Sequence, residues 1–146
     1  MQKNNGTVLI IEDKVIYMIF ASTLFENLGY KVLTAINVIK AIEIIEKGPK
    51  LNLLFIDVTS SRRVNGITLA RAVRNLAPSF KIILSSSYSI AQLEEDYGNF
   101  DEFTFLKKPY RLSEMVMRIG EVCSEQIINN TYPMTTRTNE GMLRDD

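Results

Sequence analysis

Short apolar segments alternate with longer segments of helical periodicity along most of the chain. The short ones have the length of strands and are rich in Val, Ile and Phe; they lie at 7–11, 31–35, 51–56, 81–86 and 102–106. Apolar residues recur with helical spacing at 14–28, 37–47, 66–76, 89–97 and 111–125. Strands that alternate with helices are joined by crossover connections, so the pattern predicts a doubly wound α/β domain. Its five-stranded parallel sheet should carry helices on both faces.

The first predicted helix begins unusually. Its segment VIYMIF, residues 15–20, is apolar all round, beyond the stripe that one buried helix face requires. Two interpretations are open: a docking surface for a partner helix, and a helix start that is buried more deeply than usual. They differ in one observable, the exposure of these side chains.

The alternating pattern ends near residue 124. From 125 to 146 the chain is polar and aperiodic, which favours a flexible tail over a second domain. With 146 residues, 46% of them hydrophobic, the chain is long enough for one domain with a proper core. We therefore expect one domain over 1–124 and a tail over 125–146.

Composition excludes several kinds of chemistry. Basic and acidic residues both number 17, so no overall positive field exists for binding nucleic acid or an anionic membrane. The single cysteine, Cys123, excludes an internal disulfide and a cysteine-based zinc site and is typical of a reducing cytosol. The absence of histidine removes the usual general base and every Ser-His-Asp or Cys-His mechanism. No apolar run approaches the ~20 residues of a membrane span, so we expect a cytoplasmic protein that does not bind membranes.

Reactive side chains occur where the predicted strands end. The first strand runs into Glu12 and Asp13, the third into Asp57, the fourth into Ser86 and the fifth into Lys108. Because the carboxyl ends of parallel strands share one edge of a sheet, we expect these side chains to lie close together. Three neighbouring carboxylates would repel one another unless a cation lay among them. Oxygen ligands without His or Cys favour Mg²⁺ as that cation.

This combination of groups suits phosphoryl transfer. A carboxylate can attack phosphorus and form an aspartyl phosphate. The reaction needs positioning and charge neutralisation, which Mg²⁺ and the ammonium of Lys108 can supply. Asp57 would then be the acceptor, and Ser86 would donate its hydroxyl to a phosphoryl oxygen. The histidine that such chemistry often uses can belong to the donor, so its absence from this chain is no obstacle.

Over residues 6–124 these motifs resemble the response-regulator receiver domains of two-component signalling. The segment VLIIEDK is similar to the family's first strand and acidic pair. The resemblance implies a flavodoxin-like fold with strand order 2-1-3-4-5. It implies phosphorylation of Asp57 and a Mg²⁺ site formed by Glu12, Asp13, Asp57 and the backbone carbonyl of Thr59.

A second motif, FLKKP, resembles the family's Lys-Pro motif. The resemblance gives Lys108 the catalytic lysine position and makes Ser86 and Phe105 the switch residues. The chain is most similar to single-domain receivers and to those joined to hybrid sensor kinases. It departs from them in two places. After the acceptor, Ser60-Ser61 stand in place of Met-Pro and Arg62-Arg63 follow, and Ser87 stands where the subgroup has Gly after the switch residue. Neither change removes a catalytic group, but both bear on loop dynamics, donor choice and phosphoryl lifetime.

The resemblance implies a receiver that takes a phosphoryl group from a sensor histidine kinase or a histidine phosphotransfer protein and then switches its binding to a downstream protein. It would catalyse only its own phosphorylation and dephosphorylation and would not otherwise be an enzyme. In the family, the surface that corresponds to 89–97, 102–106 and 111–125 carries homodimerisation or partner binding. The main alternative is a degenerate receiver that binds proteins independently of phosphorylation.

Two enzyme classes fit the motifs poorly. A dinucleotide enzyme would need a glycine-rich turn after the first strand, where this chain has Glu12-Asp13-Lys14. A phosphohydrolase of the haloacid dehalogenase type would need a second acid two residues after its nucleophile, where this chain has Thr59.

Overall fold

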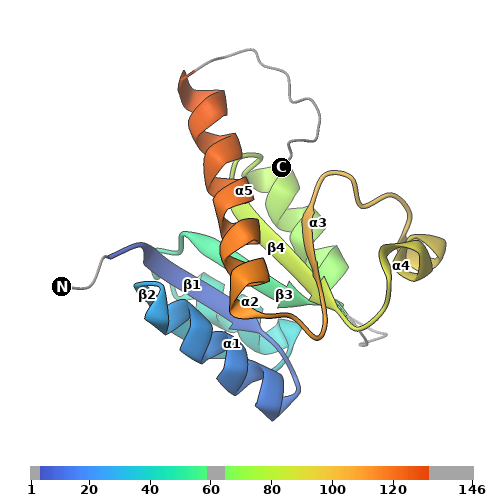
Figure 1. Cartoon of the computed structure of the whole chain (residues 1–146), viewed down its shortest axis with the longest axis horizontal. Coiled ribbons are helices and arrows are strands. Elements are labelled where there is room, and N and C mark those ends of the chain that lie inside the picture. The colour runs from blue at the N-terminus through green and yellow to red at the C-terminus, as the bar shows by residue number, and fades with distance from the viewer. Residues whose placement is uncertain (1–3, 59–64, 132–146) are drawn as a thin grey trace.

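The computed structural model describes residues 4–58 and 65–131, and for residues 124–131 it describes the backbone alone. At its centre is a parallel sheet of five strands in the order β2-β1-β3-β4-β5, as predicted (Figure 1). The strands are β1 (Gly6–Ile11), β2 (Tyr30–Ala35), β3 (Leu53–Asp57), β4 (Lys81–Ser86) and β5 (Thr104–Lys107).

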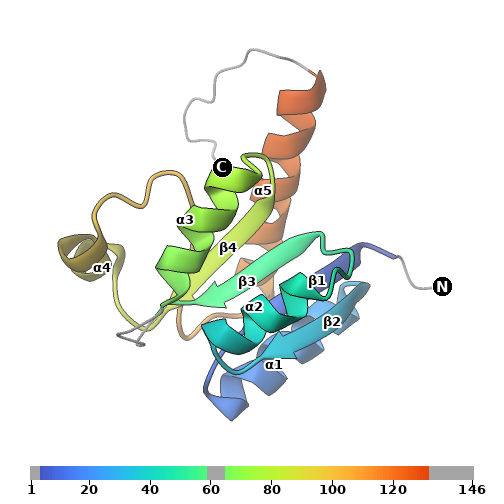
Figure 2. The same ribbon diagram turned by 180° about the vertical axis from the view of Figure 1, so that it is seen from behind.

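Helices cover both faces of the sheet. They are α1 (Val15–Asn27), α2 (Val38–Glu46), α3 (Gly66–Leu76), α4 (Ile90–Tyr97) and α5 (Leu112–Thr131). One face carries α1 and α5, and the opposite face carries α2 and α3, as the two views show (Figures 1 and 2). Among the described residues, no helix combines the length and apolar character needed to cross a membrane.

Most predicted element ends agree with the structure within two residues, but α5 does not. It runs to Thr131, whereas the sequence predicted a helix to 125 and a tail beyond it. Residues 124–131 contain neither Gly nor Pro, and the next proline is Pro133, so nothing in the covalent structure stops the helix earlier. The division into a domain over 1–124 and a tail over 125–146 stays a prediction.

The core lies in two layers, one on each side of the sheet. Along β1, Val8 and Ile10 face the α1 and α5 layer, while Leu9 and Ile11 face the α2 and α3 layer. This division follows from the alternation of side chains along a strand. All four are buried, so this part of the strand is apolar on both faces, and charged residues follow directly after Ile11.

Helix α1 is buried on one side only. Its residues Ala21, Leu24 and Phe25 enter the core, whereas Val15 and Ile16 are 71% and 73% exposed. Exposure of this size excludes the interpretation of VIYMIF as a deeply buried helix start. It leaves a bulky apolar surface at the beginning of α1.

Candidate functional site

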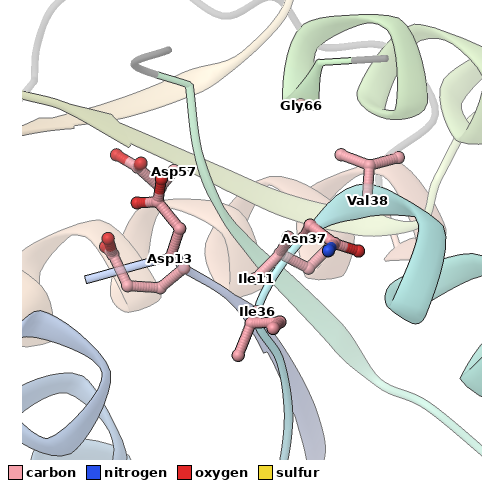
Figure 3. Close-up of a pocket in the computed structure, with 8 residues that line it drawn as sticks. Ile11, Asp13, Ile36, Asn37, Val38, Asp57 and Gly66 are labelled. Atoms are coloured by element: carbon pink, nitrogen blue, oxygen red, sulfur yellow. The ribbon is translucent and has the colours of Figure 1, made fainter. Parts of the chain in front are cut away.

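Three carboxylates meet at the carboxyl edge of the sheet. Ile11, the last residue of β1, pairs with Ile56 of β3, so Glu12 and Asp13 follow β1 beside Asp57 at the end of β3. One carboxylate oxygen from each acid lies within 4.8 Å of those of the other two. Figure 3 shows the side chains of Asp13 and Asp57 next to each other. The structure therefore brings together the three acids that the sequence placed at one edge.

Lys108 lies between two of these acids. Its Nζ atom is 2.8 Å from Oε1 of Glu12 and 2.9 Å from Oδ1 of Asp57. The backbone N–H of Lys108 donates a hydrogen bond to the carbonyl of Ser86, 2.8 Å away, which ties the lysine to the end of β4. Glu12 and Lys108 are each only 3% exposed. Such burial of charge is tolerable because each charge has an opposite partner within hydrogen-bond distance.

These ion pairs change the electrostatics expected for three bare carboxylates. Burial raises the pKa of Glu12, and the hydrogen bond from Lys108 opposes that rise without cancelling it. Burial alone would lower the pKa of the Lys108 ammonium, but hydrogen bonds and attraction from Glu12 and Asp57 outweigh it and raise that pKa. The lysine is therefore held charged, and it relieves part of the repulsion that the sequence alone suggested.

The structure also describes the two predicted switch residues, Ser86 and Phe105. Ser86 is fully buried, follows the residue that pairs with Asp57, and accepts a hydrogen bond from the backbone N–H of Tyr88 at 3.0 Å. Phe105 packs against the hydrophobic cluster on the α2 and α3 face, and its carbonyl accepts a hydrogen bond from Nε of Arg118. Thr59 and the loop with Ser60-Ser61 and Arg62-Arg63 lie outside the described residues, whereas Ser87 is described and exposed.

Two residues near the acids were not predicted from the sequence. Gly66 begins α3, and a Cβ atom there would lie 2.8 Å from the carbonyl oxygen of Asp57 and 2.5 Å from a methyl carbon of Ile56. Only glycine allows α3 to start so close to the strand that carries Asp57. The Asn65-Gly66 pair was a signal of a helix start, since Asn65 accepts a hydrogen bond from the backbone N–H of Thr68.

The second is Tyr17, whose ring centroid lies 4.1 Å from Nζ of Lys108. Tyr17 lies in the first turn of α1, which begins at Val15, whereas Asp13 precedes the helix. No sequence signal pointed to Tyr17, because the lysine that it contacts is far away along the chain.

The donor atoms fit a hard divalent cation. They are carboxylate oxygens without nitrogen or sulfur, which favours Mg²⁺ over softer metals. Asp13 is exposed, so the site is open to solvent on one side and can keep water ligands. A pocket adjoins the acids (Figure 3), lined by Ile11, Glu12, Asp13, Ile36, Asn37, Val38, Asp57 and Gly66.

A family model and two related sequences agree on the family to which this chain is similar. Residues 8–120 match the model of the family described as the response regulator receiver domain. The chain is 28% identical over 123 residues to the sensor kinase CckA of Brucella abortus; this covers 84% of the chain and only 13% of that kinase. It is 22% identical over 112 residues to sporulation initiation phosphotransferase F of Bacillus subtilis, covering 76% of the chain and 88% of that protein.

Solved structures share the fold. A response regulator receiver protein from Sinorhizobium medicae superposes with a TM-score of 0.73 at 18% identity, covering 83% of this chain and 96% of that one. The response regulator TrrA of Thermotoga maritima, solved with Mg²⁺ and BeF, gives a TM-score of 0.69 at 20% identity, covering 80% and 98%. The predicted flavodoxin-like topology is therefore confirmed.

Proposed function

Because this chain belongs to the response regulator receiver domain family, we propose that it takes a phosphoryl group from a histidine of a partner protein onto Asp57. Phosphorylation would then alter which downstream protein the domain binds. The observation that carries the proposal is the placement of Nζ of Lys108 2.9 Å from Oδ1 of Asp57, with Glu12 and Asp13 alongside. A nucleophilic carboxylate, a fixed cation and two further oxygen ligands are the groups that phosphoryl transfer to an acid needs.

In the proposed reaction an oxygen of Asp57 attacks the phosphorus atom. A new O–P bond forms, the P–N bond to the donor imidazole breaks, and its electron pair stays on the imidazole nitrogen. Lys108 neutralises charge on the transferred group, and the hydroxyl of Ser86 would turn from the Tyr88 N–H toward a phosphoryl oxygen. Mg²⁺, held by Glu12, Asp13, Asp57 and the carbonyl of Thr59, would supply charge neutralisation when bound.

The first turns of α1 support a protein partner on this side of the molecule. Val15, Ile16 and Ile19 form an exposed apolar surface, named here the α1 face. It begins two residues after Asp13, beside the acceptor edge. Surface of this kind marks interaction sites more often than it serves the isolated domain. The names of the two sequence relatives, a sensor kinase and a phosphotransferase, favour a histidine kinase or a histidine phosphotransfer protein as donor.

The proposal is tested by incubating the purified protein with acetyl phosphate and Mg²⁺ and measuring intact mass. The wild type should gain one phosphoryl group, and the gain should disappear with EDTA and in Asp57→Asn. The matched control is Asp96→Asn on α4, a carboxylate outside the site, which should be labelled like the wild type. A folded wild type that gains no phosphoryl group, from acetyl phosphate or from a phosphorylated kinase, would instead favour the degenerate receiver that binds partners without phosphorylation.

Three further expectations stay predictions: a homodimer through α4, β5 and α5, a cytoplasmic location, and catalysis limited to the domain's own phosphorylation and dephosphorylation. Cross-linking of phosphorylated and unphosphorylated protein would test the first of them.

A further inference from the structure

The ammonium of Lys108 is surrounded on three sides. Two sides are the carboxylates of Glu12 and Asp57, at 2.8 and 2.9 Å. The third is the ring of Tyr17, whose centroid is 4.1 Å from Nζ. The face of an aromatic ring carries negative electrostatic potential, so a cation at this distance is attracted to it. We propose that Tyr17 is a positioning residue, which holds the Lys108 ammonium in line with Asp57 and so links helix α1 to the acceptor site.

The surroundings of Tyr17 fit a fixed ring. Its centroid lies 6.1 Å from that of Tyr110, and Tyr110 is itself buried against Phe55 of β3 at 5.9 Å. Tyr17 therefore rests on an aromatic cluster that is anchored in the sheet. A ring that such contacts already restrain loses less side-chain entropy when it meets the lysine.

A second contact joins the start of α1 to the same charges. The backbone N–H of Lys14, the residue before the helix, donates to Oε2 of Glu12 at 3.1 Å, and α1 has no side-chain cap of its own. Glu12 thus binds Lys108 with one oxygen and the beginning of α1 with the other. The helix contacts the lysine directly through Tyr17 and indirectly through Glu12. A shift of α1, as when a protein docks on the α1 face, would therefore move the ammonium.

The positioning is tested by NMR without any phosphorylation. In a protein labelled with ¹³C-lysine, the ε-CH₂ protons of Lys108 should resonate upfield of those of exposed Lys107, because the ring current of Tyr17 acts on them. Lys108→Arg identifies the signal. The upfield shift should be lost in Tyr17→Leu and retained in Tyr17→Phe, which keeps the ring without the hydroxyl. An unchanged Lys108 signal in Tyr17→Leu would overturn the inference. This result does not depend on whether the protein is phosphorylated.

The kinetic consequence rests on the proposed function and is measured as the rate of labelling by saturating acetyl phosphate and Mg²⁺. Tyr17→Leu should slow labelling about fivefold, the size expected for loss of one partly buried cation–π contact. Tyr17→Phe should restore most of the rate. The Mg²⁺ concentration for half-maximal labelling should change less than the rate, because the cation–π contact of Tyr17 is with Lys108, which is not one of the proposed metal ligands.

Phe20→Leu is the packing control. Phe20 also lies on α1 and contacts Tyr110, at 5.6 Å between ring centroids. In the described part of the chain, the cation–π contact of Lys108 is with Tyr17 and not with Phe20. Equal slowing in Phe20→Leu and Tyr17→Leu, or failure of Tyr17→Phe to recover the rate, would reduce Tyr17 to a packing residue. A labelled wild type with an unaffected Tyr17→Leu would contradict this inference alone, while an unlabelled wild type would contradict the proposed function and leave the NMR result to decide the positioning.

Discussion

The acid–lysine site and the α1 face are neighbours that depart from ordinary burial in opposite ways. At the site, Glu12 and Lys108 are charged and 3% exposed; on the α1 face, Val15 and Ile16 are apolar and more than 70% exposed. Charged residues are rarely so buried unless paired, and large apolar patches are rarely left exposed without a use. The buried charges compensate one another within the chain. The side chains of the α1 face remain exposed among the described residues, which supports the proposed docking of a partner there.

The largest effect is expected where the buried charges lose their balance. Lys108→Ala should destabilise the protein by about 3 kcal/mol, because it leaves Glu12 and Asp57 without their buried cation. Lys107→Ala, one residue earlier and exposed, should change stability by less than about 0.5 kcal/mol. Urea unfolding in EDTA measures both. Equal urea midpoints of unfolding for the two variants would mean that Lys108 does not stabilise the buried charges of Glu12 and Asp57.

A smaller effect is expected on the α1 face, and it should concern binding and not folding. Ile16→Asp should slow phosphoryl transfer from a phosphorylated partner kinase about tenfold, roughly the loss of one interface contact, while altering the melting temperature little. Leu76→Asp is the control, since Leu76 is an exposed apolar residue at the far end of α3. If both variants receive phosphoryl groups from the kinase as fast as the wild type does, the α1 face is not the docking surface.

The smallest effect concerns Asp13, the exposed acid of the site. Asp13→Asn should raise stability without metal by about 0.5 kcal/mol, since it removes a like charge near Glu12 and Asp57 in a partly solvated position. It should also remove most of the rise in melting temperature that we expect Mg²⁺ to cause by binding only the folded protein. Thermal melts with and without Mg²⁺ provide the comparison. A wild type whose melting ignores Mg²⁺ would count against the metal site.

The two regions were not equally accessible from the sequence. The meeting of Glu12, Asp13 and Asp57 could be predicted because strand ends are visible as the ends of apolar runs, and parallel strands place them at one edge. Their roles as nucleophile and metal ligands remain predictions. The exposure of the α1 face could not be predicted, because a helix that is apolar all round has the same periodicity whether the surrounding fold covers it or not.

The strand ends also predicted that Lys108 would lie near the acids, but they did not show which acids it would pair with. The contact of the Tyr17 ring with the lysine was beyond the sequence pattern, because it arises only where α1 and the chain after β5 lie on the same face. The end of helix α5 was predicted wrongly for a different reason. Its predicted end followed the loss of apolar periodicity, whereas a polar helix can continue where no residue breaks it.

The central claim is that Asp57 is the phosphoacceptor, and one measurement addresses it directly. After incubation with acetyl phosphate and Mg²⁺, borohydride reduction converts an aspartyl phosphate into homoserine, which peptide mass spectrometry can locate. We expect homoserine at position 57 alone, and none when Mg²⁺ or acetyl phosphate is omitted. Homoserine at Asp13 or at an acid outside the site, with Asp57 intact, would contradict the account.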